Sequence, residues 1–133
     1  MSTPAAPSLL LGLVMAGGAV GAGLRYLAGN AVMRQLGGGH WPWGTLAVNL
    51  AGALVAGFLL VWLEGRANAA LWRALLVVGL LGGLTTFSSL MVELLVLGRD
   101  GRQGLAAGYV CASLAGGLLL VWLGAQLAHW LRH

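Results

Sequence analysis

The chain contains no lysine and only three acidic residues, so charge is scarce from end to end. Charged residues make up 8% of the 133 residues, against roughly 25% in an ordinary soluble domain. The seven basic side chains are all arginine, and they stand singly along the chain instead of forming a basic stripe. These shortages exclude a soluble globular fold and a nucleic-acid-binding surface.

Cysteine and histidine are also scarce. The single cysteine, Cys111, excludes an intrachain disulfide, and we expect an inert buried thiol there. The three histidines, His40, His129 and His133, fall near segment ends without the paired spacing of a zinc site.

Hydrophobic residues, by contrast, make up 59% of the chain, and the mean hydropathy is +0.90. A helix needs about 20 apolar residues to cross a bilayer core of about 30 Å. Four runs meet this length, at approximately 9–29, 43–63, 71–97 and 105–129. The separators RQLGGGHWP, EGRANAA and GRDGRQG contain charge, glycine or proline, which favour helix ends. We therefore predict an all-α, multi-pass protein in membrane lipid, with one four-helix domain over residues 1–133.

The N-terminus admits another interpretation, a cleavable signal peptide. However, MSTPAAPS carries no positive side chain, and the following apolar run is longer than the core of a typical signal peptide. We therefore interpret this segment as the first transmembrane helix.

The arginines are balanced between the two sides of the membrane. Four crossings place both termini and the second connection on one side, with Arg66, Arg73 and Arg132. The other side holds Arg34, Arg99 and Arg102, with Arg25 near its boundary. Because orientation follows an imbalance of Lys and Arg, this chain has little reason to insert one way only. We predict dual topology and an antiparallel dimer; the alternative is that Arg25 fixes a single orientation.

Glycine is abundant, with 23 residues. Small residues recur at four-residue spacing in three pairs, Gly17 with Gly21, Gly104 with Gly108, and Ala112 with Gly116. This spacing lets helix backbones approach closely in lipid. The close approach serves either a dimer interface or packing within one subunit.

Polar side chains lie in stripes on three of the predicted helices, because residues four apart share a helical face. The pairs and rows are Thr45 and Asn49, Tyr109 and Ser113, and Thr85, Ser89 and Glu93. Nearly all of these groups are neutral hydroxyl or amide donors. Such donors can replace the water of a small anion, and they can also simply bond neighbouring helices.

The third run is interrupted by GGLTTFSSL, residues 82–90. Gly82 and Gly83 each weaken a helix by about 1 kcal/mol relative to alanine. The hydroxyls of Thr85 and Thr86 compete for backbone hydrogen bonds. We predict a broken helix at mid-membrane, with loosened backbone groups that can bind an ion.

Four motifs resemble those of the bacterial fluoride channels called Fluc or CrcB. They are GAGLRY at 21–26, GTLAVNLAG at 44–52, GGLTTFSS at 82–89 and GYVCAS at 108–113. They occur in the family's order, one per span, and cover essentially the whole chain. The resemblance implies an antiparallel homodimer with two fluoride pores and a central structural Na⁺ at the dimer interface, in the inner membrane of a bacterium.

The resemblance also implies roles for individual residues. The Na⁺ site falls on the backbone carbonyls of Gly82 and Thr85 of both subunits. The pore residues correspond to Asn49, Phe87, Ser88, Thr45, Thr86, Tyr109 and Ser113, with Arg25 near a vestibule and Glu93 as the third-span carboxylate. One position departs from the family pattern TTFSTF, because Leu90 stands where a second phenylalanine is expected.

The expected function is passive, selective export of fluoride from the cytoplasm, without catalysis. Glu93 is awkward beside an anion, and it is either protonated by burial, turned aside, or a movable partner for hydroxyls. Two other functions fit a small four-helix membrane protein. A proton-coupled multidrug exporter would need a carboxylate in the first span, which has none. A nonconducting assembly subunit would copurify with a larger partner and conduct nothing alone.

Overall fold

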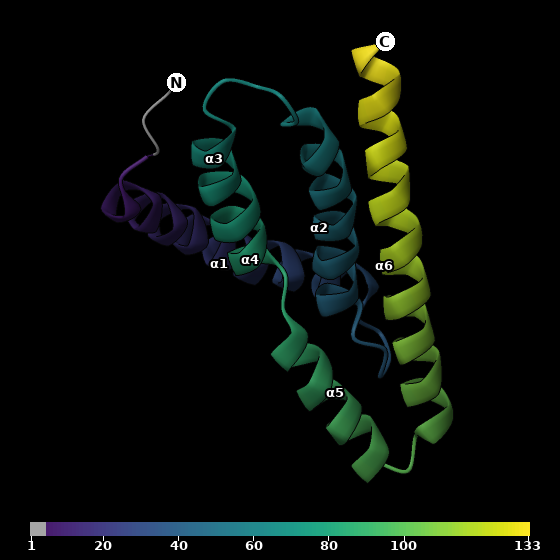
Figure 1. Cartoon of the computed structure of the whole chain (residues 1–133). Coiled ribbons are helices and arrows are strands. Elements are labelled where there is room, and N and C mark those ends of the chain that lie inside the picture. Colours follow the sequence, from purple (N-terminus) through teal and green to yellow (C-terminus); the bar gives the residue numbers. More distant parts are fainter. Residues whose placement is uncertain (1–4) are drawn as a thin grey trace.

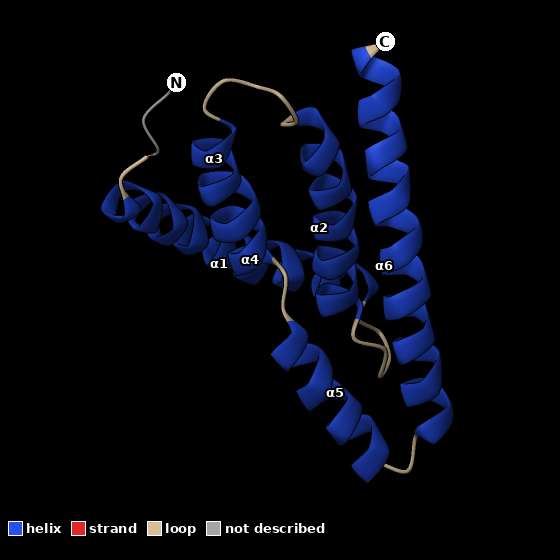
Figure 2. Cartoon of the chain, in the orientation of Figure 1, coloured by secondary structure: helices blue, strands red, loops and turns tan. Residues whose placement is uncertain are grey.

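The structure is a computed structural model that describes residues 5–133. Figure 2 shows that these residues form only helices and connecting loops. The elements in chain order are α1 (Pro7–Leu36), α2 (Trp43–Trp62), α3 (Ala69–Trp72), η1 (Arg73–Leu81), α4 (Gly82–Leu84), α5 (Phe87–Arg99) and α6 (Gln103–Arg132).

The described residues contain four segments long and apolar enough to span a bilayer: Pro7–Leu36, Trp43–Trp62, Ala69–Arg99 and Gln103–Arg132. This confirms the prediction of four long apolar helices in a multi-pass protein. The first helix continues past the expected end at residue 29 to Leu36. Pro7 lies in its first turn, where the missing N–H costs nothing, and the Gly37 N–H donates to the Met33 carbonyl at its end.

The helices pack as two closely contacting pairs, α2 with α6 and α1 with η1. In Figure 1, the C-terminal end of α6 and the α2–α3 loop lie at the top. From α4, α5 runs down and away, meeting the start of α6 at the bottom (Figure 1). A small core, Leu46, Leu90, Leu97 and Tyr109, lies where α2, α5 and α6 meet.

Glycines set the spacing of both pairs. A β-carbon at Gly124 would lie 2.0 Å from the carbonyl oxygen of Leu54, so α6 touches the α2 backbone there. A β-carbon at Gly17 would lie 2.1 Å from the Leu75 oxygen, and one at Gly21 would lie 2.0 Å from the Leu80 oxygen. The Gly17 and Gly21 pair therefore serves packing within one subunit, the second of the two interpretations given above.

The other small-residue pairs differ in their surroundings. Gly104 has nothing near its would-be β-carbon, whereas Gly108 faces the Trp41 ring and Gly116 faces Leu50. The expectation of a buried thiol is wrong for the single chain, because Cys111 is exposed on the outer face of α6. Its neighbours Ala112 and Ser113 turn inward instead.

The helix before the interruption differs from the α-helix that the sequence predicts. Residues Arg73–Leu81 form a π-helix of nine residues, in which each N–H reaches back five residues instead of four. This wider helix is the element that packs against Gly17 and Gly21 of α1. It carries the backbone to Gly82, where α-helical geometry resumes for one turn.

Candidate functional site

The chain between α4 and α5 is extended at two residues. α4 ends at Leu84, and Thr85 and Thr86 adopt φ/ψ of −87°/155° and −150°/121° before α5 begins at Phe87. Thr86 is the N-cap of α5, because its Oγ1 accepts a hydrogen bond from the Ser89 N–H at 3.2 Å. Such a cap satisfies one of the N–H groups that the first turn of a helix leaves free.

Asn49 on α2 takes over the backbone groups at this interruption. The Thr86 N–H donates to Asn49 Oδ1 at 2.7 Å, and Asn49 Nδ2 donates to the Thr86 carbonyl at 3.0 Å. Thr86 is 8% exposed, so neither group has ready access to water in the single chain. One carboxamide therefore satisfies a donor and an acceptor that a continuous helix would have paired internally.

The same arrangement leaves the Gly82 carbonyl without its helical partner. In an unbroken helix the Thr86 N–H would donate to Gly82, but here it donates to Asn49. Thr85 instead closes α4, with both its N–H and its hydroxyl donating to the Leu81 carbonyl at 2.9 and 2.8 Å. Gly82 and Thr85 both line a cavity of about 440 Å³, together with Asn49, Phe87 and Leu90.

Within residues 5–133, no group of three or more His, Cys, Asp or Glu side chains could hold a metal ion.

Glu93 joins three helices through its carboxyl group. Thr45 on α2 donates to Oε1 at 2.5 Å, and Tyr109 on α6 donates to Oε2 at 2.5 Å. Tyr109 is fully buried, and its ring lies in the small core. Of the alternatives open for this carboxyl group, the geometry corresponds to an acceptor for hydroxyls that lie on the two neighbouring helices.

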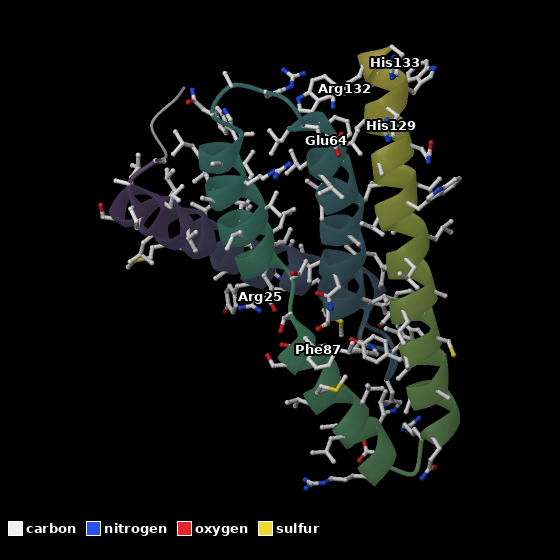
Figure 3. The ribbon with its side chains drawn as sticks, viewed as in Figure 1. Arg25, Glu64, Phe87, His129, Arg132 and His133 are labelled. Carbon is white, nitrogen blue, oxygen red and sulfur yellow. The ribbon has the colours of Figure 1, made fainter. Side chains whose placement is uncertain are left out.

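Arg25 lies on α1 beside a cavity of about 600 Å³, and is labelled in Figure 3. Thr45, Thr86 and Glu93 line the same cavity, so the structure brings these four predicted residues together. Asn30 and Ser89 also line it. Ser89 belongs to the polar row predicted for the third run, whereas no pattern in the sequence indicated Asn30.

The remaining predicted residues are more dispersed. Phe87 projects from the first turn of α5 and is 73% exposed in the single chain (Figure 3). Ser88 is exposed as well and lies 3.2 Å from the Thr86 hydroxyl. Ser113 lies one turn beyond Tyr109 on α6, and its Oγ is buried without a hydrogen-bond partner among residues 5–133. Leu90 is buried in the core beside the cavity that Phe87 lines.

Trp41 lies beside Tyr109 and was not among the residues predicted from the sequence. Its ring meets that of Tyr109 edge to face, with centroids 5.8 Å apart and planes at 70°. Its Nε1 is the other buried side-chain atom in the described chain that has no partner. An unpaired buried donor costs free energy, so the Trp41 N–H and the Ser113 hydroxyl are each available to donate to a further group. No motif pointed to Trp41, because one aromatic residue before a helix carries no specific signal.

The chain is similar to known proteins over most of its length. The family model described as "CrcB-like protein, Camphor Resistance (CrcB)" matches residues 12–125. The fluoride-specific ion channel FluC of Xylella fastidiosa strain M23 is 57% identical over 116 residues, 86% of each chain. That of Xanthomonas euvesicatoria pv. vesicatoria is 51% identical over 121 residues, 90% of each chain. That of Chelativorans sp. strain BNC1 is 45% identical over 117 residues, 87% of this chain and 93% of its own.

These relatives carry the name of an ion channel, a class of protein that is not enzymatic. The roles of the individual site residues in permeation stay predictions. The resemblance inferred from the four motifs is confirmed, and the chain belongs to the CrcB-like family.

Proposed function

We propose that this protein is a fluoride channel that lets F⁻ leave the cytoplasm passively across the inner membrane of a bacterium. The observation that carries the proposal is the set of neutral donors around the interrupted third segment, contributed by α2, α6 and the N-cap of α5. The names of the relatives support the choice of anion.

Arg25 supplies positive charge at the cavity of about 600 Å³, whose wall also includes Glu93. The Arg25 guanidinium on its wall would attract F⁻ from water. Further in, the hydroxyls of Thr45 and Tyr109 donate to Glu93, and each would have to turn from the carboxyl oxygen to an arriving ion. Glu93 is then the movable partner that satisfies these hydroxyls between ions.

The remaining groups act on either side of this point. The Ser113 hydroxyl has no competing partner among the described residues, so it is free to donate to F⁻. The exposed ring of Phe87 would present its positive edge to the ion. Asn49 is already engaged by Thr86, and its second amide hydrogen is the one left for an anion.

We propose further that two copies pair in opposite orientations, with one pore in each half. The exposed Phe87 ring and the open face at Gly82 would then lie against the second copy. The carbonyls of Gly82 and Thr85 fit a Na⁺ site, because the Gly82 carbonyl lacks its helical donor and both residues line one cavity. When bound, this ion would hold the two interrupted segments together and add positive potential near the pores.

Fluoride efflux tests the proposal. Purified protein is reconstituted in liposomes loaded with potassium fluoride, and external F⁻ is followed with a fluoride electrode after valinomycin is added. We expect rapid efflux from the wild-type protein and no comparable efflux of chloride. Asn49→Asp should lower the rate by more than about 100-fold, because the new carboxylate opposes both the anion and the Thr86 carbonyl. Phe87→Ile should also reduce it.

Two matched variants serve as controls. Phe58→Ile changes the only other phenylalanine, which stacks on Trp62 away from the site. Asn68→Asp changes an exposed loop residue with φ of 58°, a conformation that aspartate tolerates. Both should conduct like the wild type. Full efflux from Asn49→Asp and Phe87→Ile would show that these positions do not line the path, and a silent wild-type protein would overturn the proposed function.

A further inference from the structure

A second cleft lies at the C-terminal end of α2, away from the candidate functional site. A cleft of about 560 Å³ opens between the end of α2 and the start of the third segment. Phe58 and Leu76 form apolar walls, Trp62 and Trp72 lie on the two sides, and Arg66 stands in the loop that joins them. The cleft thus combines an apolar interior with one cation.

The Arg66 side chain is held in place by two contacts with Trp62. Its Nε donates to the Trp62 carbonyl at 2.8 Å, and its Cζ lies 4.3 Å from the centroid of the Trp62 ring. Trp62 in turn stacks on Phe58, with centroids 5.3 Å apart and planes at 20°. Both terminal nitrogens of Arg66 have no hydrogen-bond partner among residues 5–133. A guanidinium fixed in this way keeps a fork of donors ready for phosphate.

A second arginine at the same end of α2, Arg132, differs from Arg66 because its terminal nitrogens are hydrogen-bonded. Its terminal nitrogens donate to the backbone carbonyls of Val61 and Glu64, and one lies 3.9 Å from the Glu64 carboxylate. Figure 3 shows Arg132 and Glu64 near the C-terminal end of α6. Arg132 therefore caps α2 and faces the nearest acidic group, and no acidic residue lines the cleft beside Arg66.

The position of the cleft selects its ligand. It lies at the end of a membrane-spanning helix and has two tryptophans, the residue type that gathers at the level of the lipid headgroups. Basic pockets between transmembrane helices bind anionic headgroups. We propose that this cleft binds an anionic phospholipid, with its phosphate on the free nitrogens of Arg66 and an acyl chain against Phe58 and Leu76.

Native mass spectrometry of the purified protein tests this with phosphatidylglycerol and phosphatidylcholine of identical acyl chains. We expect the wild type to prefer phosphatidylglycerol by about fivefold, the effect of one arginine at an anionic headgroup. Arg66→Gln should abolish the preference, and Arg66→Lys should retain only part of it, because the charge remains but the fork of donors and the stacking on Trp62 are lost. Arg99→Gln is the matched control, since this exposed arginine lies at the end of α5, outside the cleft.

Vesicles locate the bound lipid. In phosphatidylcholine vesicles with brominated phosphatidylglycerol, tryptophan fluorescence should be quenched more than with brominated phosphatidylcholine, and Arg66→Gln should remove the difference. Equal binding of the two lipids by the wild type would overturn the proposal. A second copy of the chain that covers the cleft would also overturn it. A preference that survives Arg66→Gln, or that Arg99→Gln removes equally, would also overturn it.

Discussion

Asn49→Leu isolates the contribution of the Asn49 carboxamide to the interrupted segment. Leucine has nearly the shape of asparagine but neither donates nor accepts, so the change removes both bonds to Thr86, at 2.7 and 3.0 Å. Thr86 is 8% exposed, and its N–H and carbonyl would be left buried without partners. Each such group costs about 1–3 kcal/mol, which gives about 2–6 kcal/mol in total.

Reversible unfolding in mixed micelles of SDS and a mild detergent measures this difference. Even the lower value, about 2 kcal/mol, changes the unfolding equilibrium roughly 30-fold, which such titrations resolve. Hydrogen exchange gives a local measurement, because the Thr86 amide should exchange faster in the variant. Asn30→Leu is the control, since Asn30 makes no side-chain hydrogen bond within residues 5–133 and its replacement should leave both measurements nearly unchanged.

The reasoning fails if Asn49→Leu unfolds like the wild type and the Thr86 amide keeps its protection. Either result would mean that the backbone at Thr86 finds other partners without cost. Equal destabilisation by Asn30→Leu would also refute it, because the effect would then follow from any lost asparagine.

Two further predictions concern the contact of α6 with α2 and the unpaired N–H of Trp41. Gly124→Ala should separate α6 from α2 and lower the free energy of unfolding by more than about 1 kcal/mol, since its β-carbon would lie 2.0 Å from the Leu54 oxygen. Gly117→Ala is the control, because open space surrounds Gly117 and the free energy of unfolding should stay unchanged. Unfolding in micelles compares the two variants. Trp41→Phe removes an unpaired buried N–H while retaining a ring against Tyr109, so fluoride efflux should slow if that donor binds the ion or its water. Trp43→Phe is the control, because Trp43 is exposed and its replacement should leave efflux unchanged. An unaltered rate in Trp41→Phe would remove this tryptophan from the path.

Long-range partners explain what the sequence could and could not predict. The four apolar helices followed from length and hydropathy alone, because a bilayer sets a minimum for both. Helix-breaking residues indicated loosened backbone in 82–90, but not its partner, since Asn49 lies 37 positions from Thr86. Likewise, the stripes placed Thr45 and Tyr109 on separate helices, and only the fold brings both hydroxyls to Glu93.

The π-helix lay beyond any pattern in the sequence. The run RALLVVGLL has the composition of an ordinary apolar α-helix, and its wider turn is seen only together with its packing on α1. The exposed Cys111 was missed for a related reason, because hydropathy does not distinguish the inward from the outward face of a helix that is apolar all round.

Glu93 lines two spaces at once, the cavity of about 600 Å³ beside Arg25 and a smaller one of about 170 Å³ beside His40 and Asp100. A rotation that moves this side chain into one chamber withdraws it from the other, so their volumes change in opposite directions. The Glu93 side chain is therefore a partition that the two chambers share. The position of that partition depends on which hydroxyls the carboxyl group accepts at a given moment.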